Sequence, residues 1–462
     1  MFEIDKQLKT VKRIHFIGIG GSGMCPLAEI LHKEGYILSG SDNNETDTLA
    51  RIRSLGIPVA MGQRAENIEG AEMIIYTAAL LPDNPELVAA KNSGIPTYER
   101  SKLLGAITRI YPNSICISGT HGKTTACSML TQVLIEADFD PTAVIGGKLP
   151  LTGSNGLVGH SEHMVCEACE FVDTFLDLSP DIAVILNVDE DHLDYFKTFE
   201  NLKKSFTKFA SMATKTIIFN GDDINTKETV EPAVEKCNKP VITFGMNDGN
   251  IYQAVNVELK NEFASFDLIR HGENLGNVTL GIPGKHHVYN ALAVIASAME
   301  SGVSFEQCVR GINAFHGAGR RFEILAEISG ITIADDYAHH PKELEVTLET
   351  AMKMGYKKVW AVFQPFTYSR TAILFDEFAR VLQIPDRCIM TEIMGSREVN
   401  TYNIYTSQLA EKIPGSVWFN TFEEVAQYAV DNAQSGDLII TLGCGDIYKA
   451  AKIMINKLKE MK

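Results

Sequence analysis

The segment 118–125 constrains the fold of this chain more than any other stretch. It reads Ser-Gly-Thr-His-Gly-Lys-Thr-Thr and follows the apolar run 114–117, a pattern typical of a buried strand that leads through a glycine-rich loop into a helix. Glycines let backbone N–H groups surround phosphate oxygens, while a lysine supplies positive charge and the next hydroxyl can ligate Mg²⁺. The loop therefore predicts an α/β domain that binds ATP.

The loop is a shortened variant of the usual phosphate-binding loop. Two residues separate Gly119 from Gly122, where four are usual, and Ile117 stands where the first glycine would fall. A glycine-rich turn that merely caps the helix is the alternative, and the Lys-Thr-Thr continuation disfavours it. The residues expected to bind the nucleotide here are Gly119, Thr120, His121, Gly122, Lys123, Thr124 and Thr125.

Composition excludes several classes of function. The 462 residues suffice for two to four domains, and 42 Lys plus Arg against 58 Asp plus Glu give a net charge of -16. A nucleic-acid or anionic-membrane partner is therefore disfavoured. The N-terminus lacks the pattern of a signal peptide and no apolar stretch could span a bilayer, so we expect a cytoplasmic enzyme. The nine cysteines read as reduced thiols, and the lone Cys166-x-x-Cys169 pair does not indicate zinc.

The first of three α/β blocks carries a second glycine-rich loop. A predicted strand at 11–17 runs into Gly18-Ile19-Gly20-Gly21-Ser22-Gly23 and then a helix near 24–34. A second strand ends at Ser41-Asp42, where an acidic residue would meet a ribose hydroxyl. Alone this fingerprint indicates an NAD-dependent dehydrogenase, but a helix N-terminus binds any pyrophosphate, including that of a UDP-sugar. We predict a Rossmann-like domain over 1–108.

The second block, predicted as a central ATP-binding domain over 109–318, places polar residues after its strands. Glu167 and Glu170 follow one strand, and the segment 187–192, which ends in His192, follows the next. Because ligands bind outside the carboxyl ends of strands in open α/β sheets, these side chains could hold a divalent ion beside the loop phosphates. Solvated charge is at least as good an explanation of four of the acidic residues, namely Glu170, Asp189, Glu190 and Asp191.

The third block, over 319–462, is predicted to be another doubly wound α/β domain. Its strand ends carry three polar segments, at 335–341, 364–370 and 443–446. Tyrosine, histidine and arginine at such positions are more often ligand groups than core residues. Two phosphate-binding loops and a third domain that offers Arg370 indicate an enzyme that joins two anionic substrates at the expense of ATP.

Together these motifs resemble the Mur ligases of peptidoglycan synthesis, over essentially the whole chain. The segment 18–24, which ends in Met24, is similar to the family's UDP-binding loop, and 119–125 to its ATP loop. The segment 187–192 resembles its metal-site segment, and 335–341 and 364–371 its third-domain signatures. The resemblance implies three domains: an N-terminal one for the uridine nucleotide, a central one for ATP and Mg²⁺, and a C-terminal one that closes over them.

The resemblance also implies a reaction, in which the lactyl carboxylate of UDP-N-acetylmuramate is phosphorylated by ATP and the acyl phosphate is attacked by L-alanine. We expect a monomer or a homodimer. The implied metal ligands are Thr124, Glu167 and His192. The implied nucleotide contacts beyond the loop are His286, Asn290, Arg321 and Asp335. The implied catalytic residues are Lys123, Glu167, His192, His339 and Arg370. The implied contacts with the two other substrates are Gly18, Gly20, Gly21, Gly23, Met24, Ser41, Asp42, Tyr337 and Arg370.

Some positions depart from the family pattern. His287 replaces the usual asparagine, Phe366 and Thr367 stand where histidine and arginine are common, and Cys169 and Phe171 replace aspartate and serine. The closest alternative function is a recycling ligase that adds a preformed peptide to the same nucleotide. An NAD-dependent oxidoreductase, a dinucleotide-sensing module or a folate-type ligase would each leave part of the chain unexplained.

Overall fold

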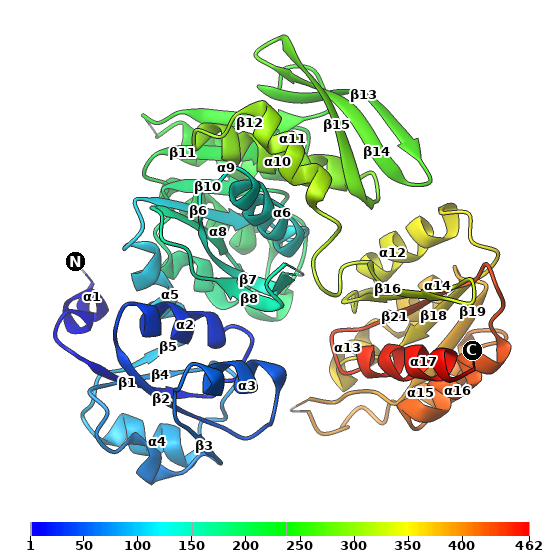
Figure 1. The fold of residues 1–462 in the computed structure, drawn as a ribbon, viewed down its shortest axis with the longest axis horizontal. Helices are drawn as coiled ribbons and strands as arrows, with labels where there is room; N and C mark the ends of the chain where they lie inside the picture. Colours follow the sequence, from blue (N-terminus) through cyan, green and yellow to red (C-terminus); the bar gives the residue numbers. More distant parts are fainter. Residues whose placement is uncertain (1, 150, 237, 397, 462) are drawn as a thin grey trace. The chain divides into compact units, whose positions relative to one another are not determined.

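The computed structural model describes residues 2–149, 151–236, 238–396 and 398–461, which form two compact units. The first unit holds most of the chain up to Ala318. The second unit consists of the chain from Gly319 onward together with two short earlier segments, 259–264 and 282–285. Three sheets are present, with five, ten and six strands (Figure 1). None of the described helices is long and apolar enough to cross a membrane.

The N-terminal sheet is parallel throughout, in the order β3-β2-β1-β4-β5. The chain adds β2 and β3 on one side of β1 and then β4 and β5 on the other side, so the order of strand addition reverses at β1. In sheets of this kind the ligand crevice opens at such a switch point. The last helix of this block is α5, which begins at Arg100 and ends at Thr108. The elements are α1 (Glu3–Leu8), β1 (Arg13–Ile17), α2 (Cys25–Lys33), β2 (Ile37–Asp42), α3 (Asp47–Ser54), β3 (Val59–Met61), η1 (Ala65–Ile68), β4 (Met73–Tyr76), α4 (Pro85–Asn92), β5 (Thr97–Glu99) and α5 (Arg100–Thr108).

The central sheet has the order β15-β14-β13-β12-β11-β10-β6-β9-β7-β8. The strands from β12 to β7 pair in parallel, and β8 closes the edge in an antiparallel hairpin with β7. Helices α6, α10 and α11 pack together, while α8 packs with α9 (Figure 1). The elements up to α9 are β6 (Asn113–Ser118), α6 (Lys123–Glu136), β7 (Thr142–Leu149), β8 (Ser154–Leu157), β9 (His163–Glu167), η2 (Phe171–Asp177), β10 (Ile182–Ile185), α7 (Leu193–Phe196), α8 (Phe199–Ser211), β11 (Thr216–Asn220) and α9 (Ile224–Val234). Those that follow are β12 (Val241–Gly245), β13 (Tyr252–Lys260), β14 (Phe263–Arg270), β15 (Glu273–Pro283), α10 (His287–Glu300) and α11 (Phe305–Ala314).

The sheet of the second unit has the order β16-β17-β21-β18-β19-β20, and only its edge strand β16 is antiparallel among the described strands. Parallel pairing of buried strands such as β18 and β21 matches the α/β prediction for this block. The elements are β16 (Glu323–Ile328), β17 (Ile331–Asp336), α12 (Pro341–Lys353), β18 (Val359–Phe363), α13 (Tyr368–Ile373), α14 (Phe375–Val381), β19 (Arg387–Thr391), α15 (Thr406–Lys412), β20 (Val417–Phe419), α16 (Phe422–Asn432), β21 (Leu438–Leu442) and α17 (Tyr448–Glu460).

One continuous apolar core joins the first two sheets. It runs from Ile14 in β1 through Leu103 in α5 to the aromatic cluster under η2. In that cluster Phe175 stacks on Phe209 at 4.9 Å between ring centroids and meets Phe206 edge-on at 5.3 Å. A fully buried phenylalanine contributes roughly 3 kcal/mol. This packing fixes the segment that follows β9, which carries acidic side chains of the candidate site.

Candidate active site

Three neighbouring strands of the central sheet deliver the candidate site. Strand β6 lies between β9 and β10, with Ile117 beside Glu167 and Ser118 beside Ile185. The glycine-rich loop follows β6, Glu167 ends β9, and the segment that leads to His192 follows β10. Parallel strands put these ends at one edge of the sheet, as the sequence predicts.

The loop is held in shape by contacts to the segment after β10. The His121 N–H donates to Asn187 Oδ1 at 2.8 Å, and the Thr120 N–H donates to the Asn187 carbonyl at 3.1 Å. Gly122 precedes α6 with φ of 84°, and a β-carbon placed there would lie 2.7 Å from Asn290 Oδ1. A side chain at this position would therefore be strained and would also collide with Asn290.

Lys123 is enclosed by its own loop and by one carboxylate. Its Nζ lies 2.8 Å from Glu170 Oε2 and donates to the Gly119 and Thr120 carbonyls. Burial alone would lower the pKa of Lys123, but the charge of Glu170 raises it above its usual value. The ammonium group is therefore charged at neutral pH and stands at the start of α6, where a phosphate would bind.

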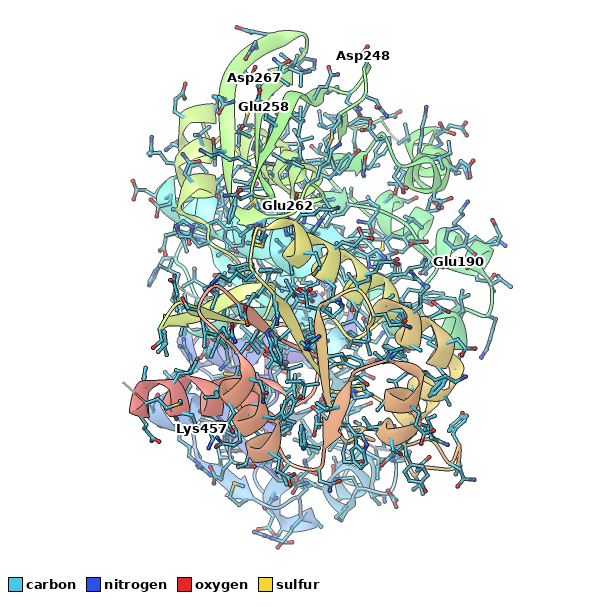
Figure 2. The ribbon with its side chains drawn as sticks, turned by 90° about the vertical axis from the view of Figure 1, so that its right-hand side faces the viewer. Glu190, Asp248, Glu258, Glu262, Asp267 and Lys457 are labelled. Atoms are coloured by element: carbon cyan, nitrogen blue, oxygen red, sulfur yellow. The ribbon has the colours of Figure 1, made fainter. Side chains whose placement is uncertain are left out.

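Glu170 is buried, so the solvated-charge explanation of this residue is wrong. Its side chain is 1% exposed, and His192 Nε2 lies 3.9 Å from its Oε1. The Phe171 ring packs on His192 with 4.7 Å between centroids. Among the three acidic residues of 189–191, Glu190 is exposed and projects outward, and Figure 2 shows it at the edge of the ribbon.

Glu167 makes a separate pair of contacts beside Thr124. Its Oε1 accepts from the Thr124 hydroxyl at 3.0 Å, and its Oε2 accepts from the Gly146 N–H at 2.7 Å. A hydroxyl and carboxylates form a set of hard oxygen donors, which suits Mg²⁺. Among the described residues no three His, Cys, Asp or Glu side chains form a metal-ligand cluster on their own. A magnesium ion here would take its remaining ligands from phosphate and water, as it does in other ATP sites.

A cavity of about 330 Å³ opens beside the loop. Tyr289 donates to Asp222 on its wall at 3.2 Å. A cavity of this size bordering a phosphate-binding loop fits a nucleoside. It is lined by His121, Gly122, Leu186, Asn187, Asn220, Asp222, Asp223, His286, Tyr289 and Asn290. The predicted nucleotide residues His286 and Asn290 thus lie with the loop. Asn187 belongs to the segment 187–192 that resembles a metal site, while Asn220, Asp222 and Tyr289 were missed because nothing local marks them.

The N-terminal glycine-rich loop is shaped from β2. The Ser41 carbonyl accepts from the Gly18 and Ile19 N–H groups at 2.8 and 3.1 Å, and Asp42 Oδ2 accepts from the Gly20 N–H at 2.9 Å. The Ser41 hydroxyl is fully buried and donates to Glu86. Ser41 and Asp42 therefore organise the loop. Their predicted contact with substrate stays a prediction.

Beneath this loop lies a buried polar network that sequence reasoning missed. Glu86 is 0% exposed and accepts from Ser41 at 2.7 Å, while His15 Nε2 lies 2.7 Å from its other oxygen. Ser39 completes the network at His15 Nδ1, at 2.8 Å. Buried polar groups require such partners.

In the second unit, Asp335 is paired with Arg320, the neighbour of the predicted Arg321. Arg320 Nε donates to Asp335 at 2.7 Å, and Thr441 donates to its other oxygen. Burial raises the pKa of Asp335, and Arg320 opposes that shift. The predicted ribose contact of Asp335 stays a prediction. Arg321 lies with its guanidinium 5.3 Å from the centre of the Tyr337 ring.

Three of the predicted third-domain residues gather at one end of this sheet. His339 Nδ1 lies 3.0 Å from the Tyr337 carbonyl and 3.3 Å from Glu343, and Arg370 donates to the Phe366 carbonyl. Burial lowers the pKa of His339, Glu343 opposes that shift, and the positive charge of Arg370 adds to it. His339 follows β17 and Arg370 follows β18, so both lie beyond the carboxyl ends of parallel strands of this sheet.

These features define a class of protein: an α/β enzyme with one glycine-rich loop at the switch point of a Rossmann-like sheet and a lysine-containing phosphate loop in a second sheet. Three family models match consecutive parts of the chain. They are the Mur ligase family catalytic domain over 13–111, the Mur ligase middle domain over 117–298, and the Mur ligase glutamate ligase domain over 320–445.

Individual relatives cover nearly the whole chain. UDP-N-acetylmuramate–L-alanine ligase of Acetivibrio thermocellus is 41% identical over 452 residues, 96% of each chain. The crystal structure of UDP-N-acetylmuramate-alanine ligase from Thermotoga maritima has a TM-score of 0.83 at 26% identity, covering 97% of this chain and all of that one. A murein peptide ligase from Psychrobacter arcticus shares the fold with a TM-score of 0.74 at 22% identity, covering 97% and 98%. The chain belongs to the Mur ligase family.

Proposed function

We propose that this protein joins L-alanine to the lactyl carboxylate of UDP-N-acetylmuramate, with cleavage of ATP to ADP and phosphate. The carrying observation is the loop at 119–125 with its charged Lys123, set beside two carboxylates and His192. The relatives that match over nearly the whole chain carry this activity in their names. A protein of this function works in the cytoplasm, as a monomer or a homodimer.

The first step is phosphoryl transfer. A lactyl carboxylate oxygen bonds to the γ-phosphorus of ATP as the bond to the bridging oxygen of ADP breaks. Charge spreads over the phosphoryl oxygens in the transition state, and the protein's main contribution is to stabilise it. Lys123 is suited to this role because Glu170 and the loop carbonyls hold its ammonium group at the start of α6.

Mg²⁺ would neutralise charge on the transferring phosphoryl group. Thr124 and Glu167 fit one ion, since both offer oxygen and are already in contact. His192 Nε2 lies 3.9 Å from Glu170 Oε1, so we assign Glu170 and His192 together to a second position. This adds Glu170 to the ligands expected from the sequence.

The second step is amide formation. The alanine nitrogen attacks the acyl carbon and loses a proton, and the tetrahedral intermediate collapses with departure of phosphate. We assign the alanine carboxylate to Arg370, which can pair with it through two parallel hydrogen bonds. His339, whose pKa is lowered, is neutral at pH 7 and can accept the proton. Tyr337 borders the same site.

The remaining assignments concern nucleotides and domain boundaries. We assign Gly18, Gly20, Gly21, Gly23 and Met24 to the UDP-sugar pyrophosphate, and His286, Asn290, Arg321 and Asp335 to ATP.

We place the domain boundaries at 108 and 318, one domain for each sheet. The order of the three sheets along the chain supports this division.

Phosphate release from MgATP and UDP-N-acetylmuramate tests the proposal. We expect release with L-alanine and a product heavier by one alanyl residue, and little release without it. Turnover with a muramyl tripeptide but not with alanine would identify the recycling ligase instead. Glycine and L-serine, tested in place of L-alanine, serve as matched controls for the size of the amino-acid side chain.

A further inference from the structure

Arg100 is the first residue of α5 and directly follows β5. Strand β5 is parallel to β4 and β1, so its carboxyl end lies at the same sheet edge as the glycine-rich loop after β1. A β-carbon placed on Gly23 of that loop would lie 3.0 Å from Arg100 Nη1 and 3.3 Å from Cζ. The guanidinium therefore packs against the loop, at the edge where ligands of such sheets bind.

The Arg100 side chain is half-buried and makes no hydrogen bond or ion pair with any described residue. A guanidinium carries five N–H donors, and none of those of Arg100 has an acceptor among the described residues. Its place at the start of a helix adds to the cost, because the positive end of the helix dipole disfavours a cation there. The fold itself gives no reason for an arginine at this position.

Arg100 also borders the predicted ATP and metal site. A small cavity of about 20 Å³, room for roughly one water, is lined by Arg100, Glu167 and Cys169 among others. Glu167 is the carboxylate that accepts from Thr124 of the ATP loop. Arg100 therefore lies between the loop assigned to the UDP-sugar and the carboxylate beside the loop assigned to ATP, and it makes no ion pair among the described residues.

We propose that Arg100 binds an anionic group of the UDP-linked substrate, through charge-assisted hydrogen bonds from its guanidinium. This inference rests on the function proposed above and adds a substrate-binding residue to it. Two groups of that substrate have suitable chemistry, the pyrophosphate and the lactyl carboxylate. Both are anionic groups that match the planar fork of an arginine.

Isothermal titration with three ligands tests the proposal. UDP carries only the pyrophosphate, UDP-N-acetylglucosamine adds a sugar without a carboxylate, and UDP-N-acetylmuramate adds the lactyl carboxylate. For Arg100→Ala we expect Kd to rise about tenfold or more, the usual effect of losing a hydrogen bond to a charged group. An equal rise for all three ligands identifies the pyrophosphate, and a rise for UDP-N-acetylmuramate alone identifies the carboxylate.

Controls separate this proposal from the proposed function. Arg100→Lys keeps the charge without the planar fork, so its Kd should lie between that of the wild-type protein and that of Arg100→Ala. Arg100→Lys also replaces Arg100→Ala as the test variant if Arg100→Ala does not fold. Arg53→Ala, in the same domain, removes a guanidinium already paired with Glu45 and should leave Kd unchanged. Unchanged Kd values in folded Arg100 variants would overturn the proposal. Failure of the wild-type protein to bind UDP-N-acetylmuramate would instead contradict the proposed function.

Discussion

At the scale of the residue, Lys123 and Glu170 depend on each other. Replacing Lys123 by Met should lower turnover by more than about a hundredfold, the usual effect of removing a group that stabilises transition-state charge. It also leaves Glu170 buried without its partner, so the melting temperature should fall as well. Phosphate release and circular-dichroism melting measure the two effects.

The double variant Lys123→Met/Glu170→Gln separates stability from catalysis. Because no buried charge is left unpaired, we expect part of the melting temperature to return while turnover stays lost. Near-normal turnover in a folded Lys123→Met protein would contradict the role of this lysine.

Asp336 gives a pH-dependent prediction. Burial raises the pKa of Asp336 to about 6, although Arg321 and the N–H groups of Ala338 and Phe322 oppose the shift. A raised pKa means that ionisation is less favourable in the folded state, so the contribution of Asp336 to stability is fully present below its ordinary pKa of 3.8 and is lost as pH rises through about 6. Relative to Asp336→Asn, the wild-type protein should therefore lose stability between pH 4 and 6. Urea unfolding across this range measures the difference, and a constant difference would contradict the burial argument.

At the scale of the element, the β7–β8 hairpin connects the two loops of the first unit. In β7 the Gly146 N–H donates to Glu167, and in β8 Gly156 packs so closely on Pro26 of α2 that a β-carbon would lie 2.6 Å away. Helix α2 starts directly after the N-terminal glycine-rich loop. The hairpin therefore contacts both the candidate ATP site and the helix that follows the candidate UDP loop.

Gly146→Ala tests this element. The added β-carbon would lie 2.7 Å from Glu167 Oε1, so the carboxylate must move. We expect a higher Mg²⁺ concentration for half-maximal turnover, with the Kd for UDP unchanged. Leu151→Ala, at an exposed position between the same two strands, is the matched control and should change neither value. An unchanged magnesium requirement in Gly146→Ala would argue against Glu167 as a ligand.

The contrast between β6 and η2 shows what a sequence can predict here. The strand β6, the loop and α6 follow from local signals, an apolar run and then glycines and a lysine, so they were predicted in place. The burial of Glu170 depends on Phe175 packing on Phe206 and Phe209, which come from α8. Arg320 and Glu86 likewise meet their partners only through the fold. Contacts between distant segments leave no local pattern, so the burial of Glu170 and the roles of Arg320 and Glu86 were missed.

At the scale of the whole molecule, the second unit has the parts of an independent domain. Its six-stranded sheet has an apolar core on each face, one around Phe363 and Phe378 and one around Ile439 and Met454. A fragment of residues 319–462 should therefore fold alone and unfold cooperatively in urea. The complementary fragment 1–318 should bind UDP without turnover. A disordered 319–462 fragment would show that this unit needs the rest of the chain.

The central claim is that the enzyme activates a carboxylate as an acyl phosphate and passes it to L-alanine. The most direct measurement uses UDP-N-acetylmuramate with heavy oxygen in the lactyl carboxylate, incubated with MgATP and L-alanine, followed by mass analysis of the phosphate and the nucleotide product. The account predicts one heavy oxygen in each phosphate released and an alanyl amide in the product. Unlabelled phosphate, or labelled phosphate without an alanyl product, would contradict it.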